Sequence, residues 1–477
     1  MRKTHQLIGG GLAVFTMLGP VWGATLVVPT GHPTIQAAVT AAVGGDTVKI
    51  SPGVYFENVT VPAGKDGLKI IGSGAASTIV DGLPLAPFGS GPGFFIESNN
   101  VTVSALTVRH AKGATLSGDG ILCQADGCTL RDLRLLSNQD NGVDIEGNDA
   151  LVANCFFSGN ESEGLELDGD AAEIVKNRAQ NQDDGGFDLE GDNLLVRENI
   201  ARVIEDSEGF LITGDNNVIE RNLASITDSD GFQISGNDAQ VINNRAELGE
   251  DDGFDISGDN PQVVGNRAQY QSNDGIRVNC LTNCATLLVQ GNTAIGSNND
   301  DEGFDIFVAS GTGSGWTVAK NSARDNVQHG FRINGSDGII RENRALRNGN
   351  ETEHGFDING DNNQIVANTA TENEADGFRI NGTSNLISLN KASKNLLEGI
   401  HLNGGDLNTL DGNSVSMNHA DGIRNDGTNT TVTNNKAGKN RTDCTSDFTN
   451  GATVAVDTGN QCADGSSVSV TQTPGVH

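Results

Sequence analysis

The chain has 477 residues, enough for one large domain or two ordinary ones. It has 62 acidic and 30 basic residues, a formal net charge of −32, and this excess argues against nucleic-acid binding because it repels a phosphate backbone. Charged residues are 19% of the chain, too few for a disordered acidic chain or a coiled coil, and 63 glycines are typical of a β protein with many turns.

Residues 1–23 have the pattern of a secretory signal peptide. Arg2 and Lys3 form a basic start, residues 7–18 form an apolar stretch, and cleavage is expected after Gly23. The apolar run is short and interrupted by glycines, which disfavours the alternative of a retained membrane anchor. We therefore expect an exported protein, secreted or periplasmic, that does not span the membrane.

Residues 24–445 contain a repeat and are predicted to form one domain. The motif acidic–Gly–aromatic–x–Ile recurs mostly every 22 or 23 residues, with three longer intervals that indicate inserted loops. Each unit has short alternating runs, such as 253–258, separated by polar turns, and no helical period. Pairing each strand with its copy one repeat later buries every inward residue. The motif glycines are Gly120, Gly142, Gly164, Gly186, Gly209, Gly231, Gly253, Gly275, Gly303, Gly330, Gly355, Gly377, Gly399 and Gly422.

Equivalent positions of successive repeats are then expected to stack as ladders. Phe and Ile, one and three residues after the glycine, point inward, and Asn nine residues before it forms a ladder of stacked amides. Cys155 occupies the Asn ladder, so we expect a buried core thiol rather than a reactive one.

This pattern resembles the right-handed parallel β-helix proteins, the pectin-lyase-like group. Residues 34–43 resemble the short amphipathic helix that caps such proteins, and residues 45–55 resemble the first coil after it. The resemblance covers roughly residues 25–445 and implies an all-β, single-stranded parallel β-helix of about 14 or more coils. It indicates the fold rather than the activity, because many activities share this fold.

The seven cysteines suggest three disulfides in an oxidising compartment. Proximity in sequence pairs Cys123 with Cys128, Cys280 with Cys284, and Cys444 with Cys462. Residues 446–477 depart from the repeat and are predicted to form a C-terminal cap and a loose tail.

Function is expected among the outward residues. Two residues after each glycine, the charge alternates from Asp255 to Arg379, which favours a ladder of ion pairs that fixes the register. The alternative is a groove for a glycan, since His329 and His354 lie beside this ladder on adjacent coils. The catalytic candidates are His329, His354, Asp305, Asp357, Arg332 and Arg379.

These residue types suit lyase or epimerase chemistry on a uronic acid. Arg332 or Arg379 would neutralise the substrate carboxylate, and His354 or His329 would remove the adjacent proton. Hydrolysis by stacked carboxylates is a further enzymatic alternative. Only Trp316, Tyr55 and Tyr270 remain as Trp or Tyr after residue 23, which weighs against sugar stacking.

A second ridge, in the turns before the glycines, is acidic throughout. Its oxygen ligands suit Ca²⁺, and the alternative is a solvated polar face that keeps the rod soluble. The candidate metal ligands are Asp183, Asp184, Asp228, Asp230, Asp251, Asp252, Asp300 and Asp301.

The sequence is compatible with two functions. The first is an exported, monomeric β-helix that binds polysaccharide and processes it as a lyase, epimerase or hydrolase. The second is a non-catalytic structural or surface-binding module. A copper-accessory role is a weaker third alternative, because Met417 is the one methionine after residue 23 and the histidines are scattered.

Overall fold

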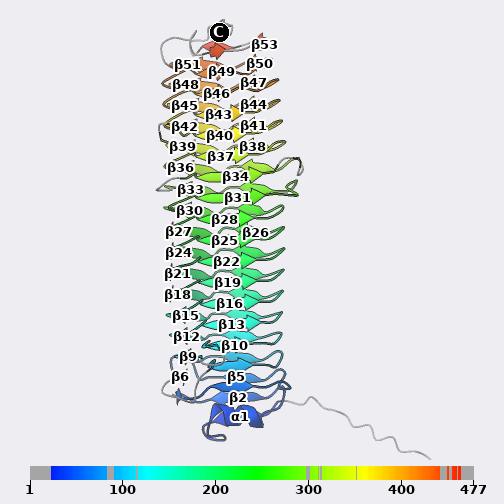
Figure 1. The fold of residues 1–477 in the computed structure, drawn as a ribbon, viewed down its shortest axis with the longest axis vertical. Helices are drawn as coiled ribbons and strands as arrows, with labels where there is room; N and C mark the ends of the chain where they lie inside the picture. Colours follow the sequence, from blue (N-terminus) through cyan, green and yellow to red (C-terminus); the bar gives the residue numbers. More distant parts are fainter. Residues whose placement is uncertain are drawn as a thin grey trace, which may run out of the picture.

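The chain forms a long rod of stacked coils (Figure 1). The computed structural model describes residues 23–82, 91–113, 117–296, 301–309, 311, 314–350, 352–440, 448–450, 454–458 and 460–462. Residues 1–22 of the predicted signal peptide lie outside this part. A short helix, α1 (Ile35–Ala41), lies in the predicted segment at the N-terminal end of the rod, and the side chain of Thr34 caps it by accepting the N–H of Ala37.

Three parallel sheets run along the rod. Sheet A runs from β1 (Thr25–Val28) to β53 (Val454–Thr458), sheet B from β3 (Gly53–Tyr55) to β54 (Gln461–Cys462), and sheet C from β4 (Val59–Val61) to β52 (Phe448–Asn450). Within the described residues they contain 19, 18 and 17 strands. This confirms a parallel β-solenoid and gives about 18 coils, because further coils lie before Gly120 and after Gly422.

Sheet C positions the candidate site. Each of its strands pairs in parallel with the strand one coil away, for example Phe254 opposite Phe232 and Ile276. Its other strands are β7 (Phe94–Ile96), β10 (Ile121–Cys123), β13 (Val143–Glu146), β16 (Leu165–Asp168), β19 (Phe187–Glu190), β22 (Phe210–Thr213), β25 (Phe232–Ser235), β28 (Phe254–Ser257), β31 (Ile276–Cys280), β34 (Phe304–Val308), β37 (Phe331–Asn334), β40 (Phe356–Asn359), β43 (Phe378–Asn381), β46 (Ile400–Leu402) and β49 (Ile423–Asn425).

The motif glycine is required by the close approach of successive coils. A Cβ at Gly253 would lie 2.6 Å from the carbonyl oxygen of Gly275 and 2.7 Å from the Cβ of Ala268. The coil then continues through β29 (Gln262–Val264) of sheet A and β30 (Arg267–Gln269) of sheet B. Any side chain at the motif position would therefore push neighbouring coils apart, which explains its regular recurrence.

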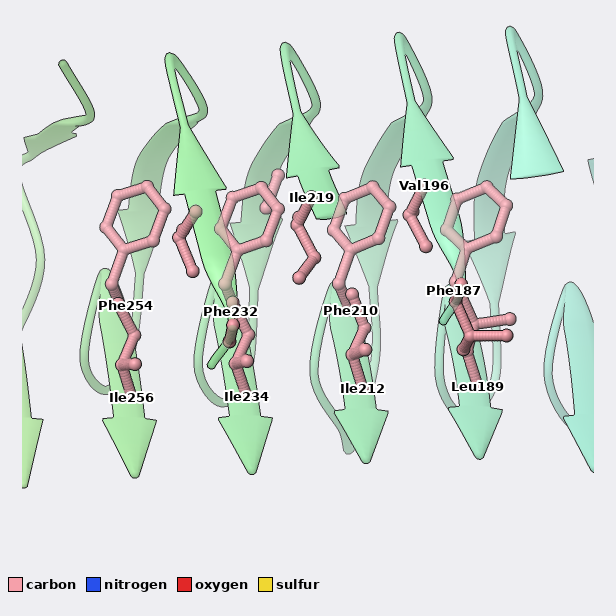
Figure 2. Close-up of a cluster of buried hydrophobic side chains, with 14 of the residues drawn as sticks. Phe187, Leu189, Val196, Phe210, Ile212, Ile219, Phe232, Ile234, Phe254 and Ile256 are labelled. Carbon is pink, nitrogen blue, oxygen red and sulfur yellow. The ribbon is translucent and has the colours of Figure 1, made fainter. Parts of the chain in front are cut away.

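The core is a set of ladders, as the sequence predicts. The rings of Phe187, Phe210, Phe232 and Phe254 stack with centroids 4.7–4.9 Å apart and interplanar angles of 3–7° (Figure 2). These rings are fully buried, together with the Ile or Leu two residues later on each strand. A second run of stacked rings joins Phe304, Phe331, Phe356 and Phe378.

The Asn ladder is a continuous hydrogen-bonded column. The Oδ1 of Asn266 accepts the backbone N–H and the Nδ2 of Asn244, at 2.8 and 3.2 Å, while its own Nδ2 donates to the carbonyl of Val241 and to Asn292. Cys155 stands in this column with a buried thiol, and burial raises its pKa to about 12. The predicted burial of this thiol in the core is confirmed.

Two of the three predicted disulfides are present, Cys123–Cys128 and Cys280–Cys284. The third, between Cys444 and Cys462, lies outside the residues whose side chains are described. Within the described part of the chain, no helix has the length and apolar character needed to cross a membrane.

Candidate functional site

Three columns of side chains define the outer surface of sheet C and of the turn before it. The turn column is the residue directly before each motif glycine. The first outward column is the residue two after the glycine, and the second is the residue four after it. In the C-terminal half, the turn column reads Asp274, Glu302, His329, His354, Asp376, Glu398; the first outward column reads Arg277, Asp305, Arg332, Asp357, Arg379, His401, Arg424; and the second reads Asn279, Phe307, Asn334, Asn359, Asn381, Asn403.

The turn column has a structural task that recurs in most coils. Its side chains accept the backbone N–H of the same position in the next coil. Asp230 accepts the N–H of Asp252 at 2.9 Å, Asp252 accepts that of Asp274 at 2.8 Å, and Asp274 accepts that of Glu302 at 2.7 Å. An acceptor is therefore needed at each turn, and carboxylates meet this need although they are buried.

Burial shifts the pKa of these carboxyl groups upward. Desolvation, followed by repulsion from neighbouring acids, raises the pKa of Asp230 to about 8 and that of Asp252 to about 7. The same causes raise the pKa of Asp274, and desolvation raises that of Glu302 although Arg332 opposes the shift. Asp230, Asp252, Asp274 and Glu302 therefore favour either protons or a cation.

Two groups of these acids could hold a metal ion. They are Asp230, Asp251 and Asp252, and Asp274, Asp301 and Glu302, and in each group one ligand atom per residue lies within 4.8 Å of the others. The predicted ligands Asp183, Asp184 and Asp228 belong to neither group, and Asp300 lies outside the described residues. Asp274 and Glu302 were absent from the predicted set, although they hold the same place before the glycine as Asp230 and Asp252.

The two histidines continue the turn column. Their rings are stacked with centroids 5.4 Å apart. The Nδ1 of His329 accepts the N–H of His354 at 2.8 Å, so its Nε2 bears the proton and donates to Glu353 at 2.6 Å. The Nδ1 of His354 lies 3.1 Å from the backbone N of Asp376, and its Nε2 lies 3.2 Å from Nη1 of Arg379.

Burial favours the neutral form of both rings. Burial lowers the pKa of His354 to about 4, against the attraction of Asp376, and burial also lowers the pKa of His329 against the attraction of Glu353. All four ring nitrogens have a protein partner. In this arrangement neither histidine presents a free nitrogen to a substrate.

Asp376 and His401 form a second polar cluster that the sequence reasoning missed. His401 lies between two carboxylates, with Nδ1 3.3 Å from Asp376 and Nε2 3.1 Å from Asp426. Burial alone would lower the pKa of His401, but these two hydrogen bonds outweigh it and raise the pKa. The signal was available, because His401 follows Arg379 in the first outward column.

The first outward column alternates in sign and lies in register across adjacent strands. Arg277 lies opposite Asp305, and Arg332 lies between Asp305 and Asp357. The column itself has one ion pair within the described residues, from Arg332 to Asp305 at 4.0 Å.

Other ion pairs lead from this column to the turn column. Arg277 lies 3.8 Å from Asp252, and Arg332 lies 3.2 Å from Glu302. Arg379, whose Cα faces Asp357, has no carboxylate within 4.0 Å in the described part of the chain.

The second outward column provides an apolar platform beside amides. Phe307 is 40% exposed on the outer surface of β34, between Asn279 and Asn334. Asn359 donates to Asn334 at 3.1 Å, and the same amide donates to Asp357 at 3.1 Å. The alternation of β34 predicts that Phe307 points outward, because Phe304, Ile306 and Val308 are the buried residues of that strand.

The connections after β31 and after β34, the strand that bears Phe307, are longer in sequence than those of the neighbouring coils. The Cys280–Cys284 disulfide closes the first. The second leads to Trp316, which is fully buried and donates its indole N–H to the carbonyl of Ser336 at 2.7 Å. Trp316 thus anchors a loop and is not available to stack on a sugar.

The family profile of the right-handed β-helix region matches residues 92–244 and 308–473, more than half of the chain. The chain belongs to the right-handed β-helix family. Its coils are therefore right-handed, as the sequence resemblance implies. No curated protein matches the sequence at a significant level.

Solved structures similar to this β-helix share little sequence with it. The catalytic domain of a GH87 α-1,3-glucanase is 10% identical, with a TM-score of 0.43 over 72% of this chain and 69% of that chain. The Dettilon tailspike protein is 13% identical, with a TM-score of 0.39 over 70% and 68%. The A-module of a mannuronan C-5 epimerase from Azotobacter vinelandii is 13% identical, with a TM-score of 0.27 over 89% and 93%.

The β-helix brings all six predicted catalytic residues to adjacent coils of sheet C and its turn. Arg379 contacts His354, and Arg332 lies 4.0 Å from Asp305. Asp357 contacts amides rather than a cation. The histidines lie in the turn column, three residues before the outward charges of the same coil, and are buried rather than exposed as a pair of accessible bases would be.

Proposed function

We propose that the C-terminal half of sheet C binds an acidic polysaccharide outside the cytoplasm. The observation that carries the proposal is Arg379, a partly exposed guanidinium with no carboxylate within 4.0 Å among the described residues of a chain with net charge −32. A guanidinium has five N–H donors in a planar fork that suits a carboxylate. Arg379 contacts the ring of His354 through one nitrogen, which leaves N–H donors for a ligand.

The surroundings of Arg379 supply the other contacts that a glycan needs. Asn359, Asn381 and Asn403 are joined by hydrogen bonds into a row of outward amides, whose remaining donors and acceptors suit sugar hydroxyl groups. Phe307 offers an exposed ring to the apolar face of a sugar. Phe307 thus supplies an exposed aromatic ring for sugar stacking in a chain that has few Trp and Tyr residues.

Processing of the glycan is the finer part of the proposal. The Nε2 of His354 lies 3.2 Å from Arg379 in the described state. A general base at Nε2 requires the tautomer in which the proton of the neutral ring lies on Nδ1, which is 3.5 Å from the carboxylate of Asp376. In that tautomer, a substrate carboxylate that draws Arg379 away would leave Nε2 free to accept a proton. Lyase and epimerase chemistry both begin with removal of the proton next to that carboxylate. Glycoside hydrolysis would use the carboxylates of the same surface instead.

Calcium is the cation we propose for the two acidic groups, because both offer only carboxylate oxygens. An extracytoplasmic location is supported by the two disulfides, which persist in oxidising compartments. We also propose a monomer.

A non-catalytic binding rod is the second candidate. It is favoured by one observation, namely that every ring nitrogen of His329 and His354 already has a protein partner. Such a rod would bind glycan along sheet C without turnover.

The test measures binding and turnover together. The full chain is titrated with polygalacturonate, alginate and a neutral glucan, with Ca²⁺ or with chelator, and ultraviolet absorbance, reducing ends and NMR report lyase, hydrolase and epimerase products. Arg379→Ala should weaken acidic-glycan binding by about 10- to 100-fold, the loss expected for hydrogen bonds to a charged group. Arg344→Ala removes an exposed arginine from β39 (Arg344–Leu346) of sheet B and should change nothing. Binding of no acidic glycan would refute the proposal, and binding without product would favour the second candidate.

A further inference from the structure

The first outward column has a period of two coils. Arg277, Arg332 and Arg379 occupy every second strand, and Asp305 and Asp357 occupy the strands between them. The pairing is in register without interruption across these five strands. Because neighbouring strands lie about 4.8 Å apart, successive arginines recur about every 10 Å along the rod.

The arginines of this column are accessible. The side chains of Arg277 and Arg332 are each 46% exposed. Each uses one or two of its five N–H donors on an acid of the turn column or of its own column. Their remaining N–H groups can therefore donate to a ligand carboxylate while the contacts to these acids are kept.

The acids between them remain without a strong cationic partner. Asp305 has one oxygen that is buried and makes no hydrogen bond, and its nearest cation is Arg332 at 4.0 Å. Asp357 accepts hydrogen bonds from the amides of Asn359 and Asn381, at 3.1 and 3.4 Å. Both positions thus present negative charge on the strands between the arginines.

We propose that this column selects a linear polysaccharide that carries one carboxylate on every second sugar, an inference that rests on the proposed glycan-binding function. A chain that lies along the rod meets a new strand at about every sugar, since a strand spacing is of the order of the length of one sugar unit. Carboxylates on alternate sugars then meet the arginines, and the uncharged sugars between them meet Asp305 and Asp357.

A polymer with a carboxylate on every sugar meets the same column less well. Half of its carboxylates would lie beside Asp305 or Asp357, where like charges repel. The acids then provide the specificity, because they repel the polymer with a carboxylate on every sugar. The arginines attract both polymers. Phe307 lies in the second outward column on the strand of Asp305, so an uncharged sugar there also has an apolar surface to contact.

The test compares oligosaccharides of equal length by isothermal titration calorimetry with the full chain at low salt in chelator. The probes are hyaluronan fragments, with one carboxylate per two sugars, oligogalacturonate, with one on every sugar, and dextran fragments, with none. We expect hyaluronan to bind at least about tenfold more tightly than oligogalacturonate, and dextran to bind least. The double variant Asp305→Asn, Asp357→Asn should gain affinity for oligogalacturonate and lose most of this preference. The matched double variant Glu166→Gln, Asp188→Asn, in the N-terminal half of the same column, should keep it.

The outcomes separate the two proposals. Oligogalacturonate binding as tightly as hyaluronan in the unmodified protein would overturn this inference and leave the proposed function standing. A preference that survives unchanged in the Asp305, Asp357 double variant would also overturn it. Failure of every anionic probe to bind would refute the proposed function itself.

Discussion

Replacing Asp252 with Asn should stabilise the protein at pH 8 when divalent cations are absent. Asp252 is 4% exposed, and desolvation raises its pKa from 3.8 to about 7. A carboxyl group whose pKa is raised on folding binds more protons in the folded state, so its contribution to stability is lost as the pH rises from about 4 to about 7. An amide at this position does not ionise and avoids that loss.

The magnitude follows from the size of the shift. About three pKa units correspond to about 4 kcal/mol at pH 8. The Oδ1 of Asn keeps the 2.8 Å hydrogen bond from the N–H of Asp274, and its new N–H₂ faces the acids of the same group. Arg277, which lies 3.8 Å from Asp252 and is half-exposed, loses an ion pair worth about 1 kcal/mol or less. The net gain should be about 3 kcal/mol at pH 8 and close to zero at pH 4.

Urea unfolding, followed by circular dichroism at pH 4, 6 and 8 in chelator, measures this gain. Asp228→Asn is the control, because Asp228 is an exposed acid on a neighbouring turn and its replacement should change the free energy of unfolding by less than about 0.5 kcal/mol. An Asp252→Asn variant that is less stable than the unmodified protein at pH 8 would refute the reasoning. So would an unmodified protein whose stability does not fall between pH 4 and pH 8.

Three other perturbations follow from the same geometry. Asn266→Ala removes four buried hydrogen bonds and leaves the N–H of Asn244 without an acceptor, so urea unfolding should show a loss of about 3–5 kcal/mol, against almost none for the exposed Gln240→Ala. Phe307→Ala should weaken acidic-glycan binding in calorimetry by about 3- to 10-fold with an unchanged melting temperature, since the ring is 40% exposed. Ca²⁺ should raise the melting temperature at pH 8 and hardly at pH 5, where protons compete for the raised-pKa acids such as Asp230.

The fold could be predicted because the residues that contact one another between coils recur at the period of the repeat. A Cβ at Gly253 would collide with the next coil, so glycine recurs there, and Phe254 stacks on Phe232 in the same way in each coil. Because equivalent residues stack on one another, the same residue type is needed at the same position of each coil. The resulting repeat can be recognised in a single sequence without any alignment. The structure has about 18 coils, more than the predicted minimum of 14, because the coils before Gly120 and after Gly422 lack the motif.

The candidate site could be predicted only in part. The outward alternation from Asp255 to Arg379 gave the register correctly, since a period of two along each strand decides which residues face solvent. It did not give the ion pairs, because the long side chain of Arg332 can reach Glu302 in the turn as well as Asp305 on its own face. Side-chain reach across two columns depends on the angle between turn and strand, which the sequence does not specify.

The histidines show why residue type at a repeated position is a weak guide to function. Asp230, Asp274, His329 and His354 all accept the backbone N–H of the next turn, and any side chain with a suitably placed acceptor can do so. A histidine in this column therefore has a structural role, accepting a backbone N–H, and its presence alone is weak evidence for a catalytic base. Departures from the stacking rule carry more information. Arg379 lacks the acidic partner that Arg332 and Arg277 have, and Phe307 exposes a ring where its neighbours in the column are amides. Neither departure is needed to hold the coils together, so each is better explained by a ligand than by the fold.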